Sequence, residues 1–295
     1  MVNKSFLRHT SLTDKILITS PCIKTYLLHQ RKIRECRLCR DHRVARKGLL
    51  KCESGNILKI DDDHLIVFDD FRNVKLNVKA DLIFADPPFG IEFKGNLKTY
   101  NRTPDALSYV EVPREDYPRF IKELVEWCYN SLKDNGSMWL ISGWNNLRWV
   151  LDAVEDAGFK QLNHVIWKYQ FGVYTRKRFV TSHYHLLLLV KDEDDYTFNK
   201  PEHYPEDVWI IKRPYHHGEE TAGNELPDEL VERCINVSSK PGDLVVDPVL
   251  GSGTTMKACL KLNRRCIGIE VNPRLEKRIR EKLKLNRPAL TNSTK

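Results

Sequence analysis

Residues 243–255 read Asp-Leu-Val-Val-Asp-Pro-Val-Leu-Gly-Ser-Gly-Thr-Thr, and they are the strongest indication of the fold class. The apolar run that ends at Asp247 predicts a short buried strand. Gly251 and Gly253 then allow the backbone to come close to a ligand, and a helix that begins at Thr254 would direct free N–H groups toward an anion. A strand, a glycine-rich turn and a helix in this order indicate an α/β protein that binds a ligand at the carboxyl end of a strand.

A second strand and turn lie earlier in the chain, where the apolar run 81–85 leads into Asp86-Pro87-Pro88-Phe89. This tetrapeptide looks like a site that grips an exocyclic amino group. The Asp86 carboxylate and the Pro87 carbonyl can each accept one amino hydrogen, and two prolines hold the acceptors in place. Because ligands collect beyond the carboxyl ends of the strands in an open α/β sheet, both segments should face one crevice.

Strands and helices alternate along most of the chain. Apolar runs predict strands at 65–69, 81–85, 138–141, 162–167, 186–190, 243–247 and 266–270. Helical periodicity predicts helices at 116–132, 145–157, 227–237, 254–262 and from Pro273 onward. This alternation indicates a largely parallel, doubly wound sheet, with 186–190 as the end of an antiparallel hairpin.

The two motifs, in this order and at this spacing, resemble the amino-methylating DNA methyltransferases that use S-adenosylmethionine. The resemblance is to the permuted (beta) group, in which the catalytic tetrapeptide precedes the cofactor loop. It extends from about residue 65 to about residue 285. It implies a Rossmann-like methyltransferase fold and site-specific methylation of a base flipped out of duplex DNA, as in restriction-modification.

The resemblance also implies which residues bind the cofactor. The helix that begins at Thr254 would hold the methionine carboxylate, and Glu270, 23 residues after Asp247, would accept hydrogen bonds from ribose hydroxyls. Asp70 matches a family carboxylate near the cofactor adenine. The full expected set is Asp70, Asp247, Pro248, Gly251, Ser252, Gly253, Thr254, Glu270 and Asn272. The motifs of nicotinamide and nucleoside-triphosphate sites, Gly-x-Gly-x-x-Gly and Gly-Lys-Ser/Thr, are absent here.

Two positions depart from the family pattern. Val249 stands where an aromatic residue is usual, and Leu226 precedes Pro227 where a lysine is usual. The missing lysine leaves open how the helix after Pro227 contacts the methionine end of the cofactor. Neither change removes the glycines or the acidic residues of the expected site.

The resemblance assigns catalysis to Asp86, Pro87, Pro88 and Phe89, with the Phe89 ring stacking on the flipped base. Asp at the first position favours adenine, so the expected product is N6-methyladenine. N4-methylcytosine is the nearest alternative by the same mechanism, and RNA bases or a protein glutamine are further ones. A rival of another class is an inactive, zinc-bearing DNA-binding protein, against which the intact site residues argue.

The net charge of +8 is concentrated near the N-terminus. Residues 1–55 hold 13 Lys/Arg and 4 Asp/Glu, whereas the remainder is close to neutral. Cationic side chains release counterions from nucleic acid, so we expect a DNA-contacting extension at 1–55 and a catalytic domain at 56–295. Within the domain, 168–215 is the expected target-recognition insert, because basic residues alternate there with aromatic ones: Lys168, Arg176, Lys177 and Arg178 are the expected DNA contacts.

The N-terminal extension also carries cysteines. Cys36 and Cys39 have a spacing that zinc ligands use, and Cys22 and Cys52 lie to either side, so a structural zinc site is one hypothesis. A second close pair is missing, and buried or unpaired thiols are the alternative reading.

The composition, 41% hydrophobic and 30% charged, is that of a soluble globular protein. No apolar run is long enough to span a membrane, and the N-terminus lacks an apolar signal core, so we expect a cytoplasmic protein. Relatives of this group often dimerise, which makes a homodimer a further expectation.

Overall fold

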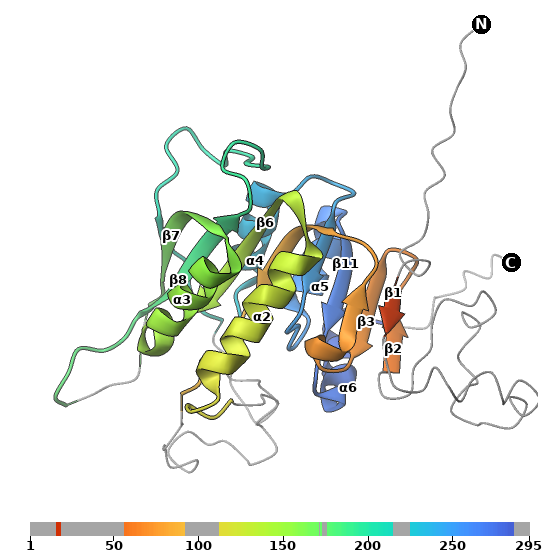
Figure 1. Cartoon of the computed structure of the whole chain (residues 1–295), viewed down its shortest axis with the longest axis horizontal. Helices are drawn as coiled ribbons and strands as arrows, with labels where there is room; N and C mark the ends of the chain where they lie inside the picture. Colours follow the sequence, from red (N-terminus) through yellow and green to blue (C-terminus); the bar gives the residue numbers. More distant parts are fainter. Residues whose placement is uncertain are drawn as a thin grey trace, which may run out of the picture.

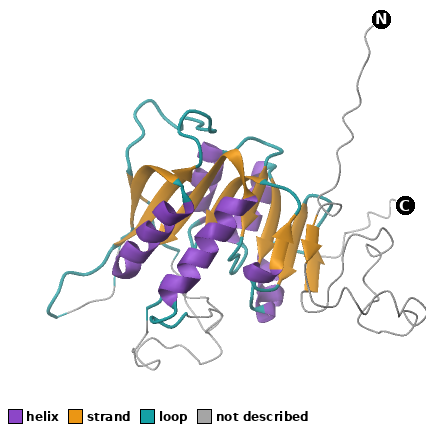
Figure 2. Ribbon diagram, viewed as in Figure 1, coloured by secondary structure: helices purple, strands orange, loops and turns teal. Residues whose placement is uncertain are grey.

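The computed structural model describes residues 16–18, 56–91, 112–170, 172, 176–214 and 225–285. In this part of the chain a central sheet is covered by helices on both faces (Figures 1 and 2). The sheet order is β2-β3-β11-β10-β5-β6-β8-β7-β9. Its strands are β2 (Asn56–Lys59), β3 (His64–Phe68), β5 (Ala80–Ala85), β6 (Leu132–Ser142), β7 (Lys160–Lys168), β8 (His183–Val190), β9 (Val208–Ile210), β10 (Leu244–Asp247) and β11 (Arg265–Ile269).

The middle of the sheet is parallel. Strands β3, β11, β10, β5 and β6 run in the same direction, β8 pairs antiparallel with both β6 and β7, and β2 pairs antiparallel with β3. A separate pair joins β1 (Ile16–Ile18) to β4 (Val74–Leu76). The predicted doubly wound, mostly parallel sheet with an antiparallel hairpin is therefore confirmed.

The helices form two outer layers. Helices α2 (Tyr117–Ser131) and α3 (Leu147–Ala157) pack on one face of the sheet, where Ile121, Leu124 and Val150 join the same apolar cluster as Ile83. Helices α4 (Asp228–Ser238), α5 (Thr254–Leu262) and α6 (Glu276–Lys282) pack on the other face, with a second cluster. Each face of the parallel strands is buried, which explains why these strands read as unbroken apolar runs.

β10 and β5 are neighbours at the centre of the sheet, and the chain leaves them toward opposite faces of the sheet. After β10 the chain enters α5 on one face, whereas after β5 it goes on to α2 on the other. A crevice opens where connections part in this way, outside the carboxyl ends of the strands. Both sequence motifs follow these two strands, so both lie at this crevice.

All helices and strands predicted from the sequence are present, with boundaries shifted by a few residues. The prediction missed β1, β2, β4 and β9, and the reason is clearest for β9. In β9 only Trp209 is buried, because it is the outermost strand, and three residues do not give a periodic signal. None of the helices in the described part has the length and apolarity that crossing a membrane requires.

Replacing Ile83 with alanine should lower the free energy of unfolding by about 2–5 kcal/mol, because Ile83 is fully buried on β5 between Val246 and Met138. Lys160→Ala, at an exposed position on β7, is the control and should change it by less than about 0.5 kcal/mol. Urea denaturation measures both. Equal effects of the two substitutions would contradict this account of the core.

Candidate active site

Acidic side chains follow four neighbouring strands at the point where each strand ends. Asp69-Asp70 comes after β3, Glu270 after β11 and Asp86 after β5, while Asp247 is the last residue of β10. These strands are adjacent in the sheet. Their carboxyl groups therefore line one edge, at the crevice between β10 and β5.

The glycine-rich turn and Glu270 are bonded to each other. Glu270 Oε2 accepts a hydrogen bond from Gly251 N (2.7 Å) and Oε1 accepts one from Asn272 N (2.7 Å). Gly251 and Gly253 have φ of 57° and 87°, values that favour glycine. Helix α5 begins directly after Gly253, and no side chain caps its first turn. The turn thus presents main-chain donors beside a buried carboxylate.

Burial governs the protonation of the three central carboxyl groups. It raises the pKa of Asp86 to about 7, with the neighbouring Asp247 acting in the same direction and the Arg213 guanidinium in the opposite one. Burial likewise raises the pKa of Asp247 to about 7, against hydrogen bonds from Thr255 and from Val249 N. The pKa of Glu270 is raised to about 7 for the same reason. A cationic ligand would therefore stabilise these groups in their charged form.

The tetrapeptide is fixed by a residue that the sequence analysis did not nominate. Asn146 Nδ2 donates to the carbonyl oxygens of Phe89 (2.6 Å) and Gly90 (3.1 Å). Asn146 is buried in the 3-10 turn Trp144–Asn146, directly after β6 and thus at the same edge of the sheet. A polar residue just after a predicted strand was the available signal. Pro87 is buried, whereas Asp86 remains partly exposed to the crevice.

Aromatic residues on β8 and directly after β7 form a wall beside the tetrapeptide. The Phe89 ring meets Tyr184 edge-on at 5.2 Å between centroids, and Tyr184 packs against Tyr169 (5.4 Å). The Arg213 guanidinium lies over both tyrosines, 4.9 Å from the Tyr169 ring and 5.4 Å from the Tyr184 ring. Arg213 could not be nominated from the sequence, because it follows β9, a strand that was not predicted.

A lysine reaches the glycine-rich turn from α6. Lys282 Nζ donates to Thr254 Oγ1 (2.6 Å) and Ser252 Oγ (3.0 Å), and lies 3.5 Å from Glu225 Oε2. Arg278 pairs with the same Glu225 at 2.7 Å. A cation is thus present at this turn although Leu226 replaces the lysine that is usual before Pro227.

Asp70 has a different environment from the other acidic residues. Its carboxylate accepts hydrogen bonds from Arg72 Nε (2.8 Å) and Nη2 (2.6 Å), and it caps the short helix Phe71–Asn73. Burial acts to raise the pKa of Asp70, but the hydrogen bonds and charge of Arg72 outweigh it and the pKa is lowered. The contact of Asp70 with a cofactor adenine stays a prediction.

The expected DNA contacts lie at and beyond the end of β7. Lys168 is its last residue, and Arg176, Lys177 and Arg178 are exposed on the connection to β8. The expected zinc ligands Cys22, Cys36, Cys39 and Cys52 lie outside the described residues, so that hypothesis stays a prediction. Within the described ranges no cluster of three or more His, Cys, Asp or Glu side chains could hold a metal ion.

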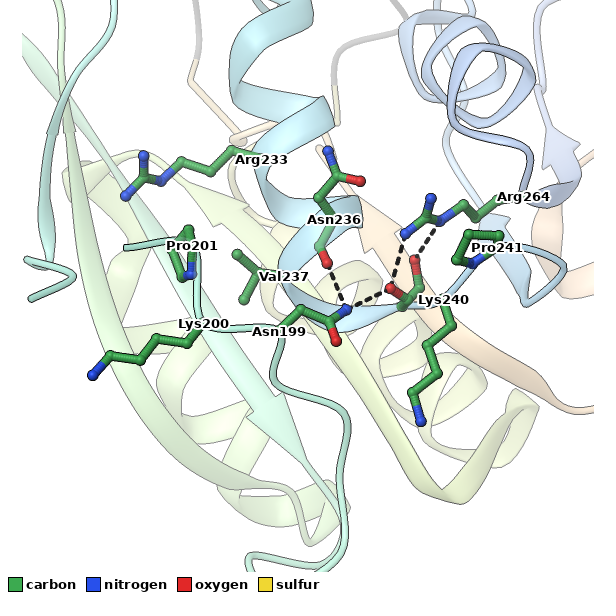
Figure 3. A pocket seen from close by; sticks show the side chains of 10 residues that line it. Asn199, Lys200, Pro201, Arg233, Asn236, Val237, Lys240, Pro241 and Arg264 are labelled. Carbon is green, nitrogen blue, oxygen red and sulfur yellow. Dashed lines mark hydrogen bonds between the residues drawn. The ribbon is translucent and has the colours of Figure 1, made fainter. Parts of the chain in front are cut away.

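A separate hollow of about 580 Å³ lies at the opposite edge of the sheet, before β10 and β11 (Figure 3). Asn199 Nδ2 donates there to the carbonyls of Asn236 (2.8 Å) and Ser239 (2.7 Å). Arg264 donates to Ser239 O (2.9 Å). These polar groups bond to one another and brace the end of α4, so we assign them a structural role.

Comparison with known proteins agrees with this geometry. A sequence profile of the DNA methylase family matches residues 80–281, which include the tetrapeptide, the glycine-rich turn and Glu270. The chain belongs to the DNA methylase family. It is an enzyme that methylates DNA, as predicted.

Two curated relatives illustrate the similarity. The methylase is 29% identical over 231 residues to the type II methyltransferase M.HpaI of Haemophilus parainfluenzae, covering 72% of this chain and 70% of that protein. It is 30% identical over 224 residues to the DNA adenine methyltransferase YhdJ of Escherichia coli K12, covering 65% and 72%.

Solved structures show the same fold. The M1.HpyAVI–SAM complex superposes with a TM-score of 0.56 at 23% identity, over 70% of this chain and 90% of that one. The cytosine-N4-specific PvuII DNA methyltransferase superposes with a TM-score of 0.59 at 17% identity, over 79% and 88%.

Replacing Asn146 with alanine should slow methylation by about tenfold or more, because the carbonyls of Phe89 and Gly90 lose their donor and the tetrapeptide loses its fixed geometry. Asn145→Ala, at the exposed neighbouring position, is the matched control and should keep the native rate. Single-turnover methylation of DNA measures both. Native activity in Asn146→Ala would show that the clamp does not position the site.

Proposed function

We propose that the methylase transfers a methyl group from S-adenosylmethionine to the N6 amino group of adenine in duplex DNA. The observation that carries the proposal is the placement of Asp86 and the Glu270-bonded glycine-rich turn at one crevice, with Asp247 between them. One segment offers acceptors for an amino group. The other offers donors and a carboxylate for a cofactor.

The residues at the crevice fit S-adenosylmethionine. Glu270 is a buried carboxylate that can accept from ribose hydroxyls, and the uncapped first turn of α5 can donate to a carboxylate. Three clustered carboxyl groups with raised pKa values suit a ligand that carries positive charge. When bound, S-adenosylmethionine supplies an electrophilic methyl group on a sulfonium. Asp247, Pro248, Gly251, Ser252, Gly253, Thr254, Glu270 and Asn272 are the proposed binding set, with Asp70 at its margin.

An exocyclic amine is a weak nucleophile, because its lone pair is delocalised into the base. The tetrapeptide can make this nitrogen more reactive. The Asp86 carboxylate accepts one amino hydrogen and the Pro87 carbonyl the other, which favours a tetrahedral nitrogen. Pro88 and the Asn146 clamp keep both acceptors in place before the reaction, so that no reorganisation is needed as charge develops. Phe89, backed by Tyr184, gives the flipped base a surface to stack on.

Two observations favour adenine over cytosine. Asp86 occupies the first position of the tetrapeptide, and the relative YhdJ, 30% identical, is named a DNA adenine methyltransferase. N4-methylation of cytosine is the second candidate, because the same acceptors would serve its amino group. The PvuII enzyme that acts in this way shares the fold at 17% identity.

Incubating unmethylated duplex DNA with the protein and S-adenosylmethionine should yield N6-methyladenine, detected by nucleoside mass spectrometry. Asp86→Ala should reduce the rate by at least about 100-fold, because an acceptor for the amino hydrogen is lost, while calorimetry still detects cofactor binding. Asp134→Ala, a fully exposed carboxylate, is the matched control and should remain active. N4-methylcytosine as product would overturn the base assignment. Activity in Asp86→Ala would overturn the catalytic one.

We also propose that 168–215 forms the target-recognition insert and that the basic segment 1–55 contacts DNA beside the catalytic domain 56–295. Arg176, Lys177 and Arg178 are exposed together, as phosphate contact requires. A structural zinc at Cys22, Cys36, Cys39 and Cys52, a homodimeric state, a cytoplasmic location and a partner restriction nuclease remain predictions from the sequence.

Replacing Arg176 and Lys177 with alanine should weaken DNA binding and reduce the slope of log affinity against log salt by about two, since each lost phosphate contact removes about 0.9. Lys200→Ala with Lys240→Ala removes the same charge at the hollow on the opposite edge and should leave the slope unchanged. Removing residues 1–50 should flatten the slope further. Fluorescence anisotropy at several salt concentrations measures these slopes. Equal slopes in the native protein and all variants would refute DNA contact both by Arg176 and Lys177 and by residues 1–50.

A further inference from the structure

A fixed cation, Arg213, lies near the tetrapeptide, and the mechanism above gives this residue no role. Arg213 follows β9, and the pairing of β9 with β7 continues past the strand through Ile211 N, which donates to Lys168 O (3.1 Å). The side-chain amide of Gln170 then donates to Arg213 O (3.0 Å) and accepts from Arg213 N (2.8 Å). The amide of Gln170 thus takes the place of a peptide group and fixes the backbone of Arg213.

The side chain of Arg213 is held as firmly as its backbone. Its guanidinium lies over the rings of Tyr169 and Tyr184, a cation–π arrangement that limits its rotamers. Tyr184 is also the ring that contacts Phe89 of the tetrapeptide. The guanidinium therefore rests on the wall that supports the tetrapeptide, close enough to Asp86 for its charge to act on that carboxyl group.

We propose that Arg213 is a positioning residue for methyl transfer, whose charge favours the carboxylate form of Asp86 that accepts a hydrogen of the target amino group. The inference rests on the function proposed above. A carboxylate accepts that hydrogen more strongly than a neutral carboxyl group does, and the partly enclosed site of Asp86 beside Asp247 disfavours the charge. The guanidinium fixed over Tyr169 and Tyr184 opposes this effect.

The other ionisable groups around Asp86 do not supply this charge. Asp247 on β10 is a carboxyl group and acts in the opposite direction, and Glu270 lies one strand further away. Tyr169, directly after β7, has its pKa raised to about 12 by burial and carries no charge near pH 7. His183 and His185 flank Tyr184 on β8, and their side chains therefore point to the other face of the sheet. Arg213 is the cation that faces Asp86 from the described elements around it.

The test compares Arg213→Met with Arg213→Lys, which removes or retains the charge. Single-turnover methylation rates from pH 5.5 to 9 should fall on the acid side as Asp86 is protonated. In Arg213→Met this fall should move upward by about one pH unit, because an opposite charge has been removed, and at pH 7 the rate should drop about fivefold. Arg213→Lys should restore most of the native profile. Arg148→Met, an equivalent loss of an exposed arginine on α3, should leave the profile unchanged.

A second readout does not depend on activity. In protein labelled with ¹³C at the aspartate side-chain carboxyl, the Asp86 signal can be assigned by its loss in Asp86→Asn and followed by NMR. Its titration should move to higher pH in Arg213→Met and return in Arg213→Lys. Slower rates at every pH, with the acid limb and the Asp86 titration unmoved, would overturn the proposal and leave Arg213 a packing role. A wild type that makes no methylated base refutes the proposed function instead, while the NMR titration still decides the effect of Arg213 on Asp86.

Discussion

The chain leaves β10 and β5 toward opposite faces of the sheet, and this topology determines where the active site can form. Because α5 leaves toward one face of the sheet and α2 lies on the other, the two connections part beyond these strand ends, where ligands bind in open α/β sheets. The glycine-rich turn forms one side of the crevice and the tetrapeptide the other. The Asn146 clamp follows β6, which lies next to β5, and the aromatic wall comes from β8 and the end of β7, further along the same sheet.

The same arrangement brings like charges together. Asp86, Asp247 and Glu270 have pKa values raised to about 7 by burial, well above those of carboxyl groups in an unfolded chain. Between about pH 4 and about pH 7 the folded protein therefore binds more protons than the unfolded chain, so the free energy of unfolding falls as the pH rises through this window. The three buried carboxyl groups thus lower the stability of the folded protein near neutral pH. A positively charged ligand offsets this loss.

Much of this could be predicted from the sequence, for reasons that are local. Glycine-rich turns and apolar runs can be recognised within a few consecutive residues, so Gly251, Gly253 and the buried strands could be predicted. Glu270 and Asp86 follow from the rule that ligands meet at strand ends. Arg213, Asn146 and Lys282 did not emerge, because their importance depends on which segments become neighbours. Arg213 owes its place to a short, mostly exposed edge strand and to one glutamine side chain, and neither leaves a periodic trace.

The pairing of β5 with β10 has a consequence for how the protein is made. Val245 faces Leu82 and Val246 faces Ile83, although the described part of the intervening chain contains α2, α3, α4 and the strands β6 to β9. Contacts between residues so distant in sequence form late, since a large loop must close before they can be gained. During synthesis, the chain therefore carries the tetrapeptide on an incomplete sheet until the C-terminal strands leave the ribosome. The acceptors for the amino group are made early, but the site is assembled only after β10 and β11 have been made.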